Sequence, residues 1–160
     1  VTIVSVGVHD ALKRFLALYN VGSRIVNLDI AHAHSKVGGQ AIKQLREFKD
    51  VYIVAGSVAT YEGAQYLFDC GANAIRAGIG GGSACSTRMK TGVGLPTLES
   101  IIDCRKSEAF LIADGGIRGA NDASKAFASG ADAIILGGAI AATDECPGEI
   151  IEKFDLKILE

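Results

Sequence analysis

The stretch "FDCGANAI" at residues 68–75 recurs as "FASGADAI" at residues 127–134, and "YNVGSRIV" at residues 19–26 is a looser third copy. In each copy a glycine stands between an amphipathic segment and a short apolar run. Glycine commonly ends a helix because it adopts the left-handed conformation without a clash of a Cβ atom. The repeat therefore predicts a chain of helices that stop at glycine and lead into buried strands.

Six apolar runs alternate with helical segments along the chain. The runs are rich in Ile, Val and Ala and show little polar alternation, as is typical of strands covered on both faces of a parallel sheet. We expect strands at residues 1–7, 25–31, 51–58, 74–80, 110–116 and 133–140. Amphipathic segments predict helices at residues 10–22, 37–48, 60–71 and 121–130, with Asp10, Thr60 and Asn121 as N-caps.

Repeated strand–helix units occur both in doubly wound sheets and in (β/α)8 barrels. Polar or glycine-rich residues follow nearly every expected strand, and a barrel builds its active site from many strand ends on one face. A doubly wound sheet concentrates its glycines in the first strand–helix turn instead. We therefore predict an α/β fold, an incomplete (β/α)8 TIM barrel with about six of eight units, as a single partial catalytic domain over residues 1–160. A full barrel takes about 250 residues, so we expect about two units to precede Val1.

The composition argues against several classes of protein. With 49% hydrophobic residues, 21% charged residues and a net charge of −2, the chain suits a globular domain and lacks the positive charge typical of nucleic-acid binding. No apolar run approaches the roughly 20 residues of a membrane span. The 4 cysteines form no CxxC pair, which favours free thiols in a reducing cytoplasm over disulfides or a zinc site. We expect a cytoplasmic protein without nucleic-acid or membrane partners, in which Cys70 and Cys104 serve in packing.

Two glycine pairs follow the last two expected strands, in "ADGGIRG" and "ILGGAI". In phosphate-binding barrels the phosphate lies on the loops after strands seven and eight. Gly115, Gly116, Gly137 and Gly138 would let backbone N–H groups approach an anion, and Asp114 suits the diol of a ribose. The alternative is that these glycines only turn tight corners between strand and helix.

The segment "GIGGGSACSTR" at residues 78–88 places glycines directly before Cys85. A cysteine reacts as its thiolate, whose formation backbone amides or a nearby cation favour, and Thr87 could pass a proton to or from the same reacting molecule. Arg88 and Lys90 could lower the pKa of Cys85, contact phosphate, or form a solvated pair. Arg76, in the strand before this loop, is expected to point into or beside the site. The alternative for Cys85 is simple packing in a loop corner.

The motifs "NLDIAHAHS", "VAGSVAT", "GIGGGSACSTR", "TGVGLP", "IADGGI", "SKAFASGADAIILGG" and "ECPGE" stand in the order and at the spacing of one known family. From about residue 4 to residue 152 the chain resembles the IMP dehydrogenase/GMP reductase family, whose fold is a (β/α)8 barrel. The resemblance implies that Cys85 adds to C2 of a purine nucleoside monophosphate, GMP or IMP. Thr87 would activate water in a dehydrogenase or manage ammonia in a reductase.

The resemblance also assigns binding residues. The implied substrate-binding residues are Ser83, Asp114, Gly115, Gly116, Gly137 and Gly138, with Asp114 on the ribose hydroxyls and Ser83, Gly116, Gly137 and Gly138 at phosphate positions. Asp29, Arg76 and Gly78 are expected on the cofactor side, with Asp29 beside the nicotinamide ribose. The backbone carbonyls of Gly80, Gly82 and Cys85 match a potassium site of the dehydrogenases.

Some residues depart from the family pattern, and the motifs divide between its two reactions. Ser57 stands where asparagine is usual, and Gly81 replaces a proline or serine. "STRMKTGVGLPTL" and "ILGGA" favour an NADPH-dependent GMP reductase, whereas "DIAHAHS" and "ECPGE" favour an IMP dehydrogenase that uses NAD and potassium. We predict the reductase, a homotetramer when complete; a non-catalytic nucleotide-binding relative is a third possibility. We expect the chain to end before the mobile flap that completes catalysis, and so to be inactive as it stands.

Overall fold

Six parallel strands form one sheet in the computed structural model, which describes residues 2–141 and 143–146. Each strand is hydrogen-bonded to the next strand in the sequence. A doubly wound sheet would reverse its strand order at a switch point, so this sequential order confirms the incomplete (β/α)8 barrel. The strands are β1 (Val4–Val6), β2 (Ile25–Asp29), β3 (Tyr52–Val58), β4 (Ala74–Ala77), β5 (Phe110–Asp114) and β6 (Ala133–Ile135).

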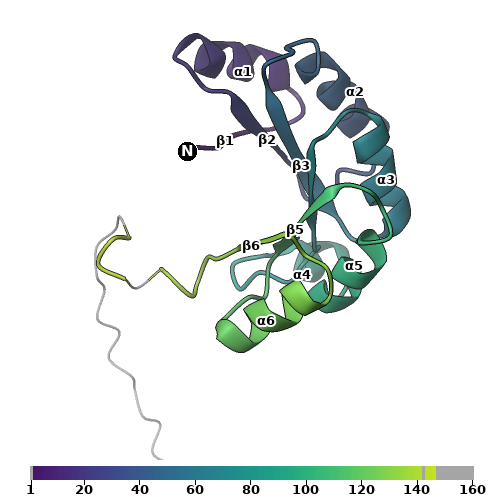
Figure 1. The fold of residues 1–160 in the computed structure, drawn as a ribbon, viewed down its shortest axis with the longest axis vertical. Coiled ribbons are helices and arrows are strands. Elements are labelled where there is room, and N and C mark those ends of the chain that lie inside the picture. Colours follow the sequence, from purple (N-terminus) through teal and green to yellow (C-terminus); the bar gives the residue numbers. More distant parts are fainter. Residues whose placement is uncertain (1, 142, 147–160) are drawn as a thin grey trace, which may run out of the picture.

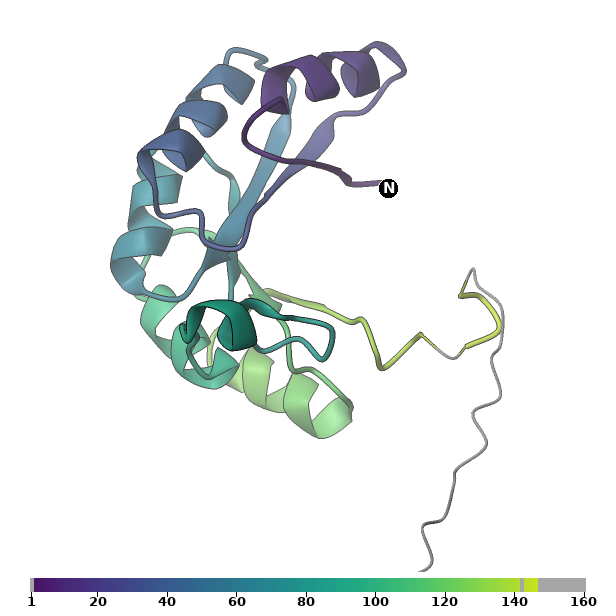
Figure 2. The ribbon, with the colours of Figure 1, turned by 180° about the vertical axis from the view of Figure 1, so that it is seen from behind.

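The helices cover the outer face of this curved sheet, and the inner face is open on one side (Figures 1 and 2). Within the described residues β1 and β6 each pair with one neighbour only, so the strands make a partial barrel. No helix in this part of the chain is long and apolar enough to cross a membrane. The helices are α1 (Ala11–Asn20), α2 (Lys36–Leu45), α3 (Tyr61–Asp69), α4 (Thr87–Thr91), α5 (Thr97–Cys104) and α6 (Ala120–Ala128).

Residues of each strand alternate between the helix layer and the inner face. Val26 and Leu28 of β2 are fully buried and belong to the main core, which also contains Phe15 of α1. Fully burying side chains of this kind contributes about 1.5–3 kcal/mol each. Their neighbours Asn27 and Asp29 lie on the opposite face because side chains alternate along a strand. The outer face thus holds the units together, while the inner face carries polar groups.

The glycines that end the helices of the repeat have the predicted conformation. Gly22, Gly71 and Gly130 follow α1, α3 and α6 with φ angles of 99°, 107° and 104°. An L side chain rarely adopts this left-handed region, so glycine is required at each of these corners. The interpretation of the three repeats as joints between helix and strand is confirmed.

The joints at Gly71 and Gly130 are each reinforced by an arginine at the amino ends of the strands. Arg46, after α2, donates hydrogen bonds to the carbonyls of Val51 and Gly71, both at 3.0 Å, and to the side chain of Asn73. The Asn73 oxygen also accepts from the backbone N–H of Ile53 at 2.8 Å. The second copy has the same arrangement, in which Arg105 bonds Ala109, Gly130 and Asp132, and Asp132 accepts from the N–H of Leu111.

Several predicted boundaries are wrong. β4, β5 and β6 end at Ala77, Asp114 and Ile135, because the glycine-rich residues that follow are loops of the site. Thr60 caps α3 as predicted and accepts a hydrogen bond from Gly63 N–H at 3.4 Å. Asp10 occupies the N-cap of α1 without making a cap bond.

The structure differs from the predicted helices at two further places. Asn121 is not an N-cap, because α6 already begins at Ala120 after Gly119. Helix α4 was not predicted, because a helix of 5 residues is too short to show a helical period in the sequence. Cys70 and Cys104 are buried as expected of packing residues.

Candidate active site

The loops after β4, β5 and β6 enclose a pocket of about 430 Å³, termed here the first pocket. Their convergence follows from the fold, because the carboxyl ends of neighbouring parallel strands meet at one edge of a barrel. The pocket brings together every residue that the sequence predicts for substrate binding, and Cys85 with them. Its lining includes Ser83, Cys85, Asp114, Gly115, Gly116, Gly137 and Gly138, with Arg118 as an additional charged residue.

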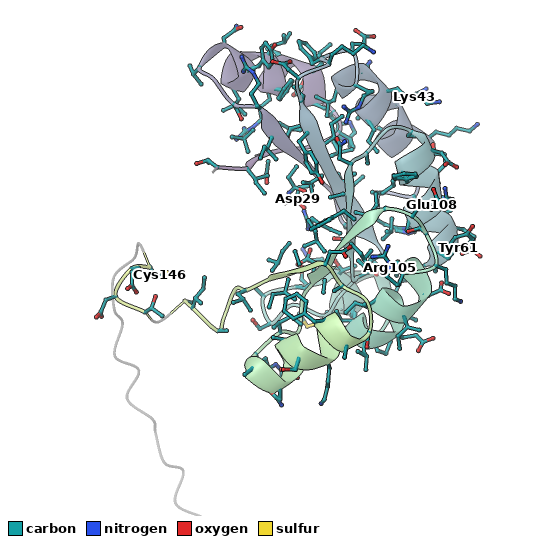
Figure 3. The ribbon with its side chains drawn as sticks, viewed as in Figure 1. Asp29, Lys43, Tyr61, Arg105, Glu108 and Cys146 are labelled. Carbon is teal, nitrogen blue, oxygen red and sulfur yellow. The ribbon has the colours of Figure 1, made fainter. Side chains whose placement is uncertain are left out.

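A second pocket of about 280 Å³ lies on the other side of Cys85, toward β2 and β3. Asp29 lies here on the inner, open side of the sheet, whereas Cys146 lies on the segment that leads away from β6 (Figure 3). The two pockets share Gly82, Cys85, Asp114 and Gly115. The remaining predicted residues line the second pocket, namely Asp29, Arg76, Gly78, Gly80 and Thr87.

Arg76 of β4 joins the carboxylates of two other strands. Its Nη1 lies 2.8 Å from Asp29 Oδ1, and its Nη2 and Nε lie 2.7 and 3.0 Å from Asp114 Oδ2. The Arg76 side chain is only 12% exposed. Burial alone would lower its pKa, but the charges of Asp114 and Asp29 outweigh burial and raise it. The guanidinium is therefore a fixed cation that crosses the inner face of the sheet.

This pairing leaves one oxygen of Asp114 available. Ser57 Oγ donates to Asp114 Oδ2 at 3.3 Å, in addition to the two bonds from Arg76. Every hydrogen bond that the described residues make to this carboxylate goes to Oδ2. Oδ1 can thus accept from a ligand hydroxyl. Ser57 also accepts from Arg76 Nη2 at 3.2 Å, so the serine is part of the network.

Asn27 and Ser5 extend the network to β1, and neither residue is among the site residues predicted from the sequence. Asn27 Oδ1 accepts from Arg76 Nη1 at 3.2 Å, and Asn27 Nδ2 donates to Ser5 Oγ at 3.0 Å. Only a weak feature of the sequence could have indicated these two residues. Ser5, Asn27 and Asp29 are polar residues at inner-face positions of otherwise apolar strands.

Cys85 has the surroundings of a reactive thiol. It is partly exposed, and the turn that carries it is closed by a hydrogen bond from its own N–H to the carbonyl of Gly82 at 3.1 Å. Hydrogen bonding from the Thr87 side chain and backbone lowers the pKa of Cys85, with smaller contributions from the Gly80 amide and the charge of Arg88. Burial instead raises the pKa of Cys104 to about 12. A lowered thiol pKa is typical of nucleophilic cysteines.

Comparison with known proteins shows the family to which the chain belongs. The family model described as "IMP dehydrogenase / GMP reductase domain" matches residues 2–157. The chain belongs to the IMP dehydrogenase/GMP reductase family.

Both branches of this family are similar to the chain. Inosine-5'-monophosphate dehydrogenase of Aquifex aeolicus (strain VF5) is 42% identical over 147 residues, which are 89% of this chain and 30% of the relative. GMP reductase of Leishmania donovani is 41% identical over 153 residues, 91% of this chain and 31% of the relative. The chain thus spans about a third of the curated relatives it matches.

Solved structures of both branches also superimpose on the chain. Inosine 5' monophosphate dehydrogenase from Legionella pneumophila gives a TM-score of 0.87 at 48% identity, covering 94% of this chain and 47% of that one. GMP reductase from Trypanosoma brucei in complex with guanosine 5'-monophosphate gives a TM-score of 0.87 at 38% identity. The match covers 93% of this chain and 33% of that one. The family resemblance inferred from the motifs is confirmed.

Gly81, which departs from the family pattern, has a steric role here. A Cβ atom added at Gly81 would lie 2.2 Å from Thr97 Oγ1 and 3.3 Å from the carbonyl carbon of Gly115. Thr97 Oγ1 is buried and has no hydrogen-bond partner within the described residues. Glycine at this position therefore lets the Cys85 loop pack against α5 and the loop after β5.

Gly81→Ala is expected to lower the free energy of unfolding by about 1–3 kcal/mol, the usual cost of forcing an extra carbon into a packed site. Thr97→Ala removes the clashing oxygen and should restore most of this loss. Thr97→Val keeps a carbon in its place and should not restore it. Urea unfolding of the single and double variants measures the effect; equal losses in the threonine and alanine backgrounds would show that the clash is not the cause.

Proposed function

We propose that the chain supplies the nucleotide-binding face and the nucleophile of an NADPH-dependent GMP reductase. One observation carries the proposal, namely that Cys85 stands on the common wall of two pockets. The first pocket has the character of a nucleotide site, and the second offers carboxylate and guanidinium groups to a cofactor. A nucleophile between two such sites can hold a substrate carbon within reach of a hydride donor.

The first pocket suits a purine nucleoside monophosphate. The loops after β4 and β6 approach each other closely. A Cβ atom added at Gly138 would lie 3.6 Å from Ser83 Oγ. Backbone N–H groups of glycine loops can surround an anion, and the Ser83 hydroxyl can donate to one. The free Oδ1 of Asp114 would accept from a ribose hydroxyl. Arg118, on the same pocket, adds a positive charge for the phosphate.

The second pocket fits the ribose of a nicotinamide cofactor. The side chain of Asp29 is 49% exposed, and Arg76 is bonded to its Oδ1. Within the described residues Oδ2 has no hydrogen bond, so it would be available to a hydroxyl. Gly78, on the same pocket wall, presents backbone without a side chain in the way. When bound, NADPH supplies a hydride to C2 of the purine.

In the proposed reaction, the Cys85 thiolate forms a bond to C2 of GMP. The exocyclic C2–N bond then breaks, and the departing amine takes up one proton and leaves as ammonia, with Thr87 positioned to transfer that proton. After hydride has reached C2, the Cys85 sulfur leaves with the electron pair of the C–S bond. The product is IMP, and the thiolate is regenerated.

An IMP dehydrogenase is the second candidate, favoured by the higher identity of the Legionella pneumophila structure. It would use the same C–S bond, with NAD as oxidant and Thr87 activating water. The carbonyls of Gly80, Gly82 and Cys85 would hold its potassium ion, and oxygen donors suit such a hard cation. Of the "ECPGE" motif that favours this reaction, residues 147–149 lie outside the described residues. The retained Cys85 and Thr87 argue against a third candidate, a non-catalytic binding protein.

The reaction is tested with the longest open reading frame that contains the chain, which we expect to yield a cytoplasmic homotetramer. Nicotinamide absorbance is followed with GMP and NADPH, and separately with IMP, NAD and potassium. We expect NADPH to be consumed only with GMP. Formation of NADH with IMP would replace the reductase with the dehydrogenase, and binding of nucleotide without either reaction would favour the non-catalytic protein.

A further inference from the structure

The side chain of Arg76 reaches carboxylates on two different strands. Asp29 of β2 and Arg76 of β4 both pair with Gly56 of β3, so these three residues lie at one level of the sheet. A Cβ atom at Gly56 would lie 2.5 Å from Arg76 Cβ. Glycine at this position therefore lets the arginine pass over β3 to Asp29, while Asp114 of β5 meets the same guanidinium from the other side.

The guanidinium of Arg76 uses all of its N–H groups within the protein. Nε bonds Asp114, and Nη1 bonds Asp29 and Asn27. Nη2 bonds Asp114 and Ser57. Arginine presents these donors in one planar fork, so the guanidinium cannot turn toward one carboxylate without leaving the other. The orientation of each carboxylate is thus tied to that of the other.

The two carboxylates are held unequally. Asp114 accepts two bonds from Arg76 and one from Ser57, and its side chain is 21% exposed. Asp29 accepts one bond from Arg76, and its side chain is 49% exposed. Asp29 therefore has more orientational freedom left to lose when a ligand binds.

The two carboxylates also connect the two pockets. Asp114 lines both pockets, and Asp29 lines only the second. A ribose hydroxyl on the free oxygen of Asp114 would fix that carboxylate, and through the guanidinium it would fix Asp29 as well. A ligand that then enters the second pocket would find Asp29 already oriented. Less side-chain entropy would be lost in the second binding event, which favours it.

We propose that Arg76 is a positioning residue that couples the two pockets, so that a nucleotide in the first pocket strengthens binding of a dinucleotide cofactor in the second. The inference rests on the proposed function and adds cooperativity between its two ligands. Because coupling between two binding sites is reciprocal, the cofactor strengthens nucleotide binding by the same factor. We expect this factor to be about three- to tenfold.

The test is calorimetric titration with GMP of the protein encoded by the longest open reading frame, alone and with saturating oxidised NADP or NAD, whichever binds. The oxidised cofactor has no hydride to donate and GMP has no hydrogen on C2, so the ligands cannot react. 2',3'-Dideoxy-GMP keeps the base and the phosphate but lacks the hydroxyls for Asp114. Direct contact between base and cofactor is common to the two nucleotides and cancels in their ratio. We expect the cofactor to raise the affinity for GMP about three- to tenfold more than that for the dideoxy nucleotide.

Two variants assign the coupling to the bridge. Arg76→Lys keeps a positive charge but gives up the planar fork, so the extra coupling of GMP should disappear although each ligand still binds. Asn27→Ala removes another acceptor of the same guanidinium and leaves both carboxylate bonds, so the coupling should persist. Urea unfolding checks that both variants are folded. The comparison of the two nucleotides needs no variant, so the coupling is tested even where Arg76→Lys is unstable.

Four results would each overturn the inference. They are equal coupling of the two nucleotides in the wild type, a cofactor that weakens GMP binding, extra coupling that survives in Arg76→Lys, and an equal loss of coupling in Asn27→Ala. All four leave the proposed function standing. Failure of the wild-type protein to bind GMP or either cofactor would overturn the proposed function and the coupling together.

Discussion

Cys85→Ser is expected to reduce turnover at least about a thousandfold in the complete enzyme, because a hydroxyl cannot replace a thiolate as nucleophile at neutral pH. The substitution leaves the proposed phosphate and ribose contacts untouched, so nucleotide affinity should stay within about tenfold of wild type. Steady-state rates and calorimetric titration with GMP measure the two effects. Their separation distinguishes loss of chemistry from loss of binding.

Cys70→Ala is the matched control, since it removes a buried thiol from the end of α3, away from both pockets. Its turnover should remain within about twofold of wild type. Appreciable turnover by Cys85→Ser would exclude a covalent mechanism through this residue. Parallel loss of binding and turnover would make Cys85 a packing residue, the alternative that the sequence left open.

Arg76→Met is expected to lower the free energy of unfolding by about 2–4 kcal/mol. Removing one partner of a buried ion pair leaves uncompensated charge, which commonly costs 3–5 kcal/mol, and the half-exposed Asp29 makes the loss smaller here. The variant also frees Asp114 Oδ2 and loosens its carboxylate, so the KM for nucleotide should rise. Urea unfolding and steady-state kinetics measure these effects.

Arg24→Met provides the comparison, because the Arg24–Asp50 pair is about half exposed on both sides. An exposed ion pair contributes about 0–1 kcal/mol, so this variant should lose far less stability. Arg76→Lys should be intermediate, since an ammonium cannot present the planar fork that bridges two carboxylates. If Arg76→Met lost no more stability than Arg24→Met, the network would have no structural role.

The parts of the fold that depend on local chemistry could be predicted from the sequence. The glycines at 71 and 130 fix their corners through their own backbone conformation, so each repeat marked a true joint. The convergence of Cys85 and Asp114 also followed, because parallel strands place their carboxyl ends together. Local sequence patterns were therefore sufficient to predict the structure wherever a single residue or a single repeat of apolar residues determined it.

The features that depend on register and long-range packing were not predictable in this way. The register of the sheet places Arg76 level with Asp29, because both residues pair with Gly56 of β3, and it places Asp114 two residues beyond Ile112, the partner of Arg76 on β5. The contact between Gly81 and Thr97 joins a loop to a helix that the sequence pattern does not place together. Helix α4 lies between these two classes, since it is local but too short to show a period.

The most direct test of the covalent mechanism is mass spectrometry of the Cys85 peptide from enzyme quenched with acid during turnover of GMP and NADPH. We expect part of the peptide to carry the added mass of the purine nucleotide on Cys85, and the adduct to vanish when the substrate is exhausted. Continued turnover with Cys85 unmodified at every quench time would contradict a covalent intermediate on this cysteine.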